Sequence, residues 1–274
     1  MALNRPFVYI ASLRRTGSTV LAEALTSFPM SFIFREPELG RGRFNLRPGD
    51  AELFAAHGVD LKAIQARLAG RSISRSVRAR VSGRLSSLVA GFKSQVVDPL
   101  DGIVSQWGVK EIRHEGWESY FEQFSEMRTI LTGRDPRDIY ISLHHRVRQG
   151  KGTWQGPLTP RGLADDLMSE FAQQLEIEKR GACLRVKYED LCTDPAVIHK
   201  ALRFVESPLV SPGGAGGFNV ENPHRREEAV LHGGEITNKR VRRWASETDR
   251  QLLDAANEMY SLMGEYCESW GYAV

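Results

Sequence analysis

Short apolar runs alternate with amphipathic stretches along this chain of 274 residues. Runs rich in β-branched and aromatic residues predict buried strands at about 7–12, 31–34, 109–113, 128–133 and 182–188. Helical spacing of apolar residues predicts helices at about 17–28, 117–127, 136–148, 162–179 and 195–205. Strands that alternate with helices favour a parallel sheet with helices on both of its faces.

Two stretches depart from this alternation. From about Ala51 to Val97 the apolar residues are spaced as interrupted amphipathic helices, so we predict that 41–106 is a helical insertion in a single α/β domain spanning 1–274. Residues 207–234 include a glycine-rich run and several prolines, which predicts a flexible loop, either a plain surface loop or a lid over a substrate. The last helix is predicted to begin at a capping box, Ser246–Asp249.

The composition narrows the class of protein. Hydrophobic residues make up 41% and charged residues 26%, as in an ordinary globular protein, and the net charge of +3 is too mild to imply a nucleic-acid partner. The three cysteines are widely spaced, which favours a reducing compartment, and no metal-binding pattern is present. No apolar stretch approaches the roughly 18 residues of a membrane span. We therefore expect a soluble, cytoplasmic protein without a metal.

The segment between the first strand and the first helix has the character of an anion-binding turn. It reads Ser12-Leu13-Arg14-Arg15-Thr16-Gly17-Ser18-Thr19. Gly17 lets the backbone approach an anion closely, while the N–H groups of the turn and the side chains of Arg15, Ser18 and Thr19 supply donors. The segment lacks the first glycine and the lysine of the G-x-x-x-x-G-K-[ST] nucleotide loop.

A second segment helps to indicate which anion this turn would bind. It reads Arg134-Asp135-Pro136-Arg137-Asp138 at the end of a predicted strand, and Ser142 follows eight residues after Arg134. Together the two segments resemble the sulfotransferases, most closely the carbohydrate sulfotransferases and their bacterial relatives. The resemblance implies a P-loop-type three-layer α/β fold and 3′-phosphoadenosine 5′-phosphosulfate as the sulfuryl donor, with 3′-phosphoadenosine 5′-phosphate as the product and no metal.

The same resemblance assigns the donor site. The turn with Arg14, Arg15, Thr16, Gly17, Ser18 and Thr19 would hold the 5′-phosphosulfate. Arg134 and Ser142 would hold the 3′-phosphate, and Tyr188 would lie near the adenine. The basic segment with Lys239, Arg240 and Arg242 would close over the nucleotide.

Four residues are candidates for the chemistry of transfer. Cations must face the breaking bond, and Arg15 is the first choice, since Arg14 has a less certain aim. A base must accept the proton of the acceptor hydroxyl, and Glu36 lies at the carboxyl end of a predicted strand, in a Glu-Pro pair like that of the carbohydrate sulfotransferases. His114 is an alternative base. Lys110 either faces the sulfate or acceptor, or pairs with Glu111 or Glu115.

The acceptor is not encoded in these motifs, and neither is the oligomeric state. We expect a hydroxylated small molecule or a carbohydrate. Arg67, Arg71 and Arg75 fall on one helical face, which is either a site for an anionic acceptor or a solvated basic face. Two other interpretations remain open: a P-loop kinase acting on a small molecule, and a polyanion-binding module that uses the basic stretch at 61–97.

Overall fold

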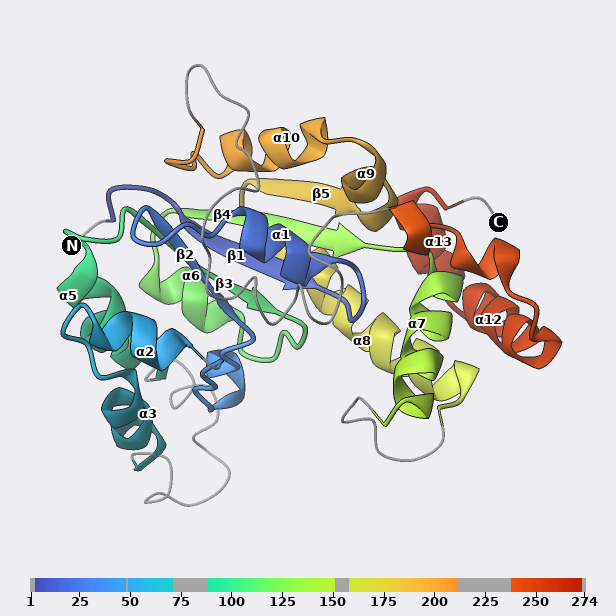
Figure 1. Cartoon of the computed structure of the whole chain (residues 1–274), viewed down its shortest axis with the longest axis horizontal. Helices are drawn as coiled ribbons and strands as arrows, with labels where there is room; N and C mark the ends of the chain where they lie inside the picture. Colours follow the sequence, from blue (N-terminus) through green and yellow to red (C-terminus); the bar gives the residue numbers. More distant parts are fainter. Residues whose placement is uncertain (1–2, 48, 71–87, 151–157, 211–237, 273–274) are drawn as a thin grey trace.

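A five-stranded parallel sheet forms the centre of the protein (Figure 1). The computed structural model describes residues 3–47, 49–70, 88–150, 158–210 and 238–272. In spatial order the strands are β2 (Ser31–Arg35), β3 (Gln106–Glu111), β1 (Phe7–Ser12), β4 (Met127–Gly133) and β5 (Cys183–Lys187). The prediction of a parallel sheet is therefore confirmed. β1 lies in the middle, so the turn that follows it has strands on both sides.

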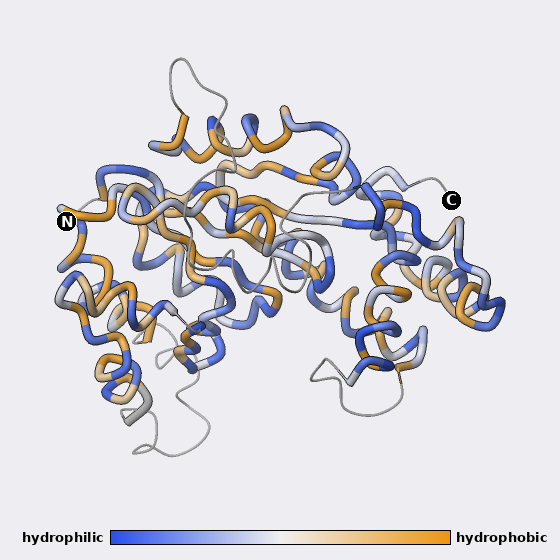
Figure 2. The backbone as a smooth tube through the Cα atoms, in the orientation of Figure 1, coloured by the Kyte–Doolittle hydropathy of each residue, from blue (hydrophilic) through white to orange (hydrophobic). Residues whose placement is uncertain are grey.

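Helices cover both faces of the sheet, because alternate residues of the buried strands point to opposite sides. Val8 and Ile10 of β1 face α1 (Ser18–Ala24), α9 (Tyr188–Thr193) and α10 (Ala196–Phe204). Phe7 and Tyr9 face the other cluster, which includes residues of α6 (Glu118–Gln123) and α8 (Pro160–Glu178). The hydrophobic colouring follows the strands through the centre of Figure 2. The predicted three-layer α/β architecture is thus confirmed.

Further helices pack beside β2, at the left of Figure 1. They are α2 (Asp50–Ala55), α3 (Leu61–Gly70), and a helical stretch over 88–100 that contains η2 (Lys93–Val97) and α5 (Asp98–Leu100). Phe54 and Phe92 from these helices meet Phe32 and Phe34 of β2 and Trp107 of β3 in one aromatic cluster. The insertion contains helices, as predicted. Of the three arginines predicted to share one helical face, Arg71 and Arg75 lie outside the described residues.

The carboxyl ends of the strands point toward a second group of helices, at the right of Figure 1. These are α7 (Pro136–Arg148), α12 (Arg250–Leu262) and α13 (Gly264–Trp270), and α12 packs against α7 and α8. Two short helical turns, η3 (Asn238–Arg240) and η4 (Arg243–Ser246), precede α12. We call residues 238–246 the C-terminal strap.

Several predicted boundaries were wrong. α1 ends at Ala24 rather than near residue 28, and Tyr188 begins α9 rather than ending β5. Asp249 is the N-cap of α12, since its carboxylate accepts from the N–H of Leu252 at 3.2 Å, so the helix begins after the proposed capping box. Most of the predicted 207–234 loop lies outside the described residues, and whether it acts as a lid stays open.

Candidate active site

The turn between β1 and α1 has the shape of an anion site. Arg15 and Gly17 both adopt left-handed backbone conformations, with φ of 66° and 78°. The Thr16 hydroxyl points inward, donating to the carbonyl of Leu13 at 2.7 Å and lying 2.6 Å from the hydroxyl of Thr132 on β4. No side chain of the described residues caps α1. The turn therefore presents its backbone N–H groups, rather than the Thr16 side chain, to a ligand.

Gly17 is enclosed as well as left-handed. A Cβ atom built on it would lie 2.5 Å from a ring carbon of Tyr188, the first residue of α9. Such a contact is well below the sum of the van der Waals radii, so the ring leaves room only for glycine. Ser18 is buried and Thr19 half-buried at the start of α1.

Arg134 joins this turn to the C-terminal strap. Its guanidinium donates to the carbonyl of Arg15 at 3.1 Å and to the carbonyl of Arg240 at 2.5 Å, and it lies 3.9 Å above the ring of Tyr188. It also contacts the carboxylate of Asp138 at 3.4 Å. Its Nε is buried and has no hydrogen-bond partner among the described residues, which leaves a charged donor for an anion.

The strap is held on α7 by Asp138. One carboxylate oxygen accepts from the N–H of Arg242 at 2.9 Å, and the other accepts from the N–H of Trp244 at 3.2 Å. Burial raises the pKa of Asp138, and the charge of Arg134 opposes the shift. The side chains of Lys239, Arg240 and Arg242 are exposed. The predicted basic segment therefore does lie beside Arg134, attached through its backbone.

Two neighbouring arginines of the turn point in different directions. Arg15 Nε donates to the hydroxyl of Ser142 on α7 at 3.1 Å. The guanidinium of Arg14 instead lies 3.8 Å from Asp166 of α8. Burial lowers the pKa of Arg14, as does the nearby Arg113. Arg15 thus belongs to the group around Ser142 and Arg134, whereas Arg14 lies near Asp166 and Arg113.

Glu36 follows β2 in a left-handed conformation with φ of 56°. Lys110 Nζ donates to its Oε1, and a guanidinium nitrogen of Arg47 donates to its Oε2 at 2.7 Å. Burial raises the pKa of Glu36, but the charges and hydrogen bonds of Lys110 and Arg47 outweigh burial and lower it to about 2. The Glu36 side chain is 23% exposed and that of Lys110 only 2%, so the carboxylate is the part of the pair that solvent reaches.

Lys110 therefore pairs with Glu36 rather than with Glu111 or Glu115, the salt-bridge partners in one of the two alternatives from the sequence. The other alternative, that it faces the sulfate or the acceptor, stays a prediction. Arg47 was not identified from the sequence, because it lies in a loop with no local pattern that points to Glu36. Its guanidinium also donates to the carbonyl of Arg35 at 3.2 Å, which anchors it at the end of β2.

His114 has a different environment. It is completely buried, with its ring 6.4 Å from that of Tyr9, and its backbone N–H donates to Glu170 at 3.0 Å. Burial lowers the pKa of its imidazole to about 3. In this arrangement the ring does not face solvent as Glu36 does, which weakens its candidacy as the base.

The register of the sheet brings the two groups together. Ala11 pairs with Glu111 and Arg35 pairs with Lys110, so the turn after β1 and the residues Lys110 and Glu36 emerge from one edge. The Ser12 hydroxyl donates to the carbonyl of Glu111 at 2.7 Å and links the two strands. Ligands of open parallel sheets bind at this edge, outside the carboxyl ends of the strands.

Two further features of the described residues bear on the class of protein. They include no helix that is long and apolar enough to cross a bilayer. Nor do three of their His, Cys, Asp or Glu side chains gather as metal ligands would.

Solved structures with a similar arrangement include sulfotransferases. The sulfotransferase domain from the Synechococcus PCC 7002 olefin synthase matches with a TM-score of 0.62 and 17% identity, over 100% of this chain and 97% of that one. The sulfotransferase domain from the curacin biosynthetic pathway matches with a TM-score of 0.59 and 15% identity, over 100% of both chains. The chain has the sulfotransferase fold.

A third sulfotransferase-fold structure, sulfotransferase STF9 from Mycobacterium avium, has a TM-score of 0.50 and 12% identity, over 98% of this chain and 77% of that one. No family model matches the sequence, and no curated protein matches it. The likeness therefore lies in the three-dimensional arrangement, at identities that establish the fold.

Replacing Gly17 by Ala should damage the turn. A left-handed conformation costs a non-glycine residue about 1–2 kcal/mol, and the Tyr188 ring must also move. We expect a lower melting temperature in thermal unfolding followed by circular dichroism. Gly102→Ala is the matched control, since a Cβ there would meet nothing within 4 Å. Equal melting temperatures for the two variants would contradict the enclosed geometry of Gly17.

Proposed function

We propose that the protein is a sulfotransferase that moves a sulfuryl group from 3′-phosphoadenosine 5′-phosphosulfate to a hydroxyl of a sugar or another small molecule. We call the turn at 12–19 the phosphosulfate turn. The observation that supports the proposal most strongly is that this turn, the Arg134–Ser142 group and the Glu36–Lys110 pair lie at one edge of the sheet. These are the parts that sulfuryl transfer requires: anion donors for the donor nucleotide and a carboxylate beside a cation for the acceptor.

Different groups of the protein would bind the two anionic ends of the donor. The backbone N–H groups around Gly17 would bind the 5′-phosphosulfate. Arg134 Nε and the Ser142 hydroxyl would bind the 3′-phosphate, and the exposed strap residues Lys239, Arg240 and Arg242 would add positive charge. Tyr188, which contacts both Gly17 and Arg134, would lie beside the adenine of the nucleotide.

The acceptor hydroxyl would attack the sulfur, and the bond from sulfur to the bridging phosphate oxygen would break. Glu36 would take the hydroxyl proton, which leaves a sulfate ester and 3′-phosphoadenosine 5′-phosphate. A carboxylate whose pKa is about 2 is a weak base, so the reaction requires Lys110 to release it. If Lys110 turns toward the negative charge of the transferring group, the pKa of Glu36 rises and the cation stabilises that charge at the same time.

Calorimetric titration of the whole chain with 3′-phosphoadenosine 5′-phosphate tests the donor assignment. We expect saturable binding of this bisphosphate, and no comparable binding of ATP with or without magnesium, because the turn lacks the lysine of a triphosphate loop. A preference for ATP with magnesium would instead support the kinase interpretation. Acceptors can then be screened by mass spectrometry for the mass gain of one sulfuryl group.

A further inference from the structure

The side chain of Glu111, the last residue of β3, contacts the segment that carries Glu36 and has no role in the proposed reaction. Its Oε1 accepts from the N–H of Glu38 at 2.9 Å and from the hydroxyl of Tyr120 on α6 at 3.1 Å. Its own carbonyl accepts from the Ser12 hydroxyl at the start of the phosphosulfate turn. One residue therefore contacts the start of that turn, α6 and the segment that carries Glu36.

The segment Glu36–Glu38 is a backbone under strain. Glu36 and Glu38 have φ of 56° and 55°, a region that costs each such residue about 1–2 kcal/mol. The turn keeps this shape because its backbone is bonded to β3: the N–H of Glu36 donates to the carbonyl of Lys110 at 2.6 Å, and the N–H of Glu38 donates to Glu111. The second bond comes from a side chain, and a substitution can remove it.

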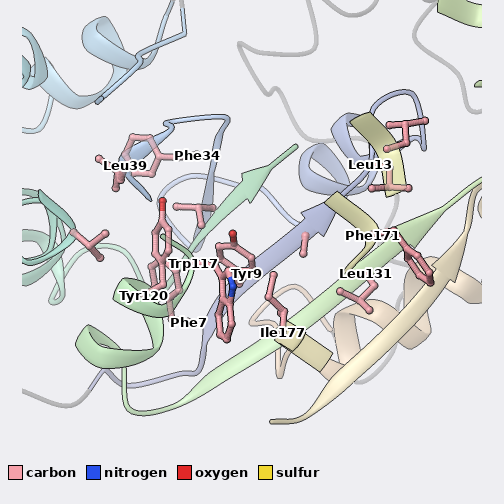
Figure 3. Close-up of a cluster of buried hydrophobic side chains, with 14 of the residues drawn as sticks. Phe7, Tyr9, Leu13, Phe34, Leu39, Trp117, Tyr120, Leu131, Phe171 and Ile177 are labelled. Carbon is pink, nitrogen blue, oxygen red and sulfur yellow. The ribbon is translucent and has the colours of Figure 1, made fainter. Parts of the chain in front are cut away.

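The surroundings of Glu111 favour a neutral carboxyl. The residue is buried, and the rings of Tyr9 and Tyr120 lie beside each other in the same apolar cluster, as Figure 3 shows. Burial raises the pKa of Glu111 to about 8; the Tyr120 and Glu38 hydrogen bonds and Lys110 oppose this rise, whereas Glu36 adds to it. Burial also raises the pKa of both tyrosines, so they stay uncharged.

We propose that Glu111 is a positioning residue, which fixes the Glu36 carboxylate beside Lys110 by holding the Glu36–Glu38 turn through the N–H of Glu38. Its effect on turnover rests on the proposed function, but the contact itself does not. Once Glu111 ionises, its negative charge holds Lys110, which is then no longer free to turn from Glu36 to the transferring group. The same residue thereby sets an alkaline limit, above about pH 8, on the arrangement that catalysis needs.

Three variants separate this role from general packing. Glu111→Leu removes the acceptor for Glu38, and we expect kcat to fall about tenfold, as when a buried donor loses its partner. The dissociation constant for 3′-phosphoadenosine 5′-phosphate should change less than twofold. Glu111→Gln keeps the acceptor oxygen without the ionisation, so its kcat should stay near the wild-type value at pH 7. Tyr120→Phe is the matched control, because it removes the other bond to Oε1 and leaves Glu38 bonded.

The pH profile provides a readout that packing alone does not change. Wild-type kcat should decline above about pH 8, and Glu111→Gln should lack that decline. Because the folded protein binds this proton more tightly than the unfolded chain does, wild-type stability should fall as pH rises from the ordinary carboxyl value of 4.5 toward 8. The melting temperature of Glu111→Gln should therefore rise relative to that of wild type as pH increases over that interval. These two comparisons remain available if Glu111→Leu does not fold.

Amide hydrogen exchange over residues 36–40, measured by mass spectrometry, tests the contact without any catalysis. We expect slow exchange in wild type and Glu111→Gln, and faster exchange in Glu111→Leu. A folded Glu111→Leu protein with wild-type kcat, or identical pH profiles for wild type and Glu111→Gln, would overturn the positioning role. Failure to bind the bisphosphate, with the exchange pattern intact, would overturn the proposed function and leave the contact standing.

Discussion

Replacing Glu36 by Gln should lower kcat by about 10²- to 10⁴-fold, the range expected when a general base is removed. Gln keeps the size of the side chain and an oxygen for Lys110, but its amide does not accept the hydroxyl proton. Binding of the donor product should hardly change, because Glu36 belongs to the Lys110 group rather than to the Arg134 group. Steady-state kinetics at saturating donor and acceptor, with calorimetry of 3′-phosphoadenosine 5′-phosphate, measure the two effects.

Glu38→Gln is the control for this change. Glu38 lies in the same turn with the same left-handed conformation, yet its carboxylate pairs with Arg41 and Arg43 instead of Lys110. Its kcat should stay within a few-fold of wild type. A Glu36→Gln enzyme with the wild-type rate would exclude Glu36 as the base, and equal losses in the two variants would point to the turn's charge rather than to proton transfer.

The acid side of the pH profile tests Glu36 against a base that titrates near neutral pH. His114, whose pKa burial lowers to about 3, is separated from Glu36 by the Glu36→Gln variant instead. Lys110 and Arg47 hold the pKa of Glu36 near 2 against the effect of burial, so the carboxylate is ionised in the free enzyme above that pH. We therefore expect kcat/KM to show no loss of the base between pH 8 and pH 5. A histidine near its usual pKa would lose activity as pH falls through about 6.5. A steep decline centred there would contradict the Glu36 assignment.

The sequence predicted the sheet and the strand-turn-helix unit because those features depend on local patterns. The apolar runs at Phe7–Ser12 and Met127–Gly133 have the length and composition of buried strands, and Gly17 marks the turn. Boundaries were less accurate where tertiary contacts decide them. The interruption between α12 and α13 falls at Met263, directly before Gly264, so glycine was a local signal that the prediction did not use.

The candidate site was predicted at the level of residues and only partly at the level of contacts. Lys110 was singled out, but its partner depends on the alignment of β2 with β3, which the sequence does not encode locally. Arg47 reaches Glu36 across a loop for the same reason. Asp138 is the instructive omission. It lies in the first turn of α7, while Arg134 precedes that helix, and the two side chains meet at 3.4 Å.

Replacing Arg134 by Ala should weaken binding of 3′-phosphoadenosine 5′-phosphate by about 10- to 100-fold, the loss expected for a charged hydrogen bond of 1.5–3 kcal/mol. Stability should fall too, because buried Asp138 then keeps only the N–H groups of the strap as partners. Calorimetry well below the melting temperature separates the two effects. Arg128→Ala is the control on β4, the strand that Arg134 directly follows, since Arg128 forms an exposed pair with Glu206.

A further variant decides whether Arg134 acts on the nucleotide or through the strap. Asp138→Asn retains Arg134 but weakens the bonds that hold Arg242 and Trp244 on α7. If Arg134 binds the 3′-phosphate directly, Asp138→Asn should cost much less bisphosphate affinity than Arg134→Ala. Adenosine 5′-phosphosulfate, which lacks the 3′-phosphate, should then bind wild type and Arg134→Ala with similar affinity. Equal losses for both variants and both nucleotides would mean that Arg134 serves chiefly to attach the strap, and the 3′-phosphate would need another partner.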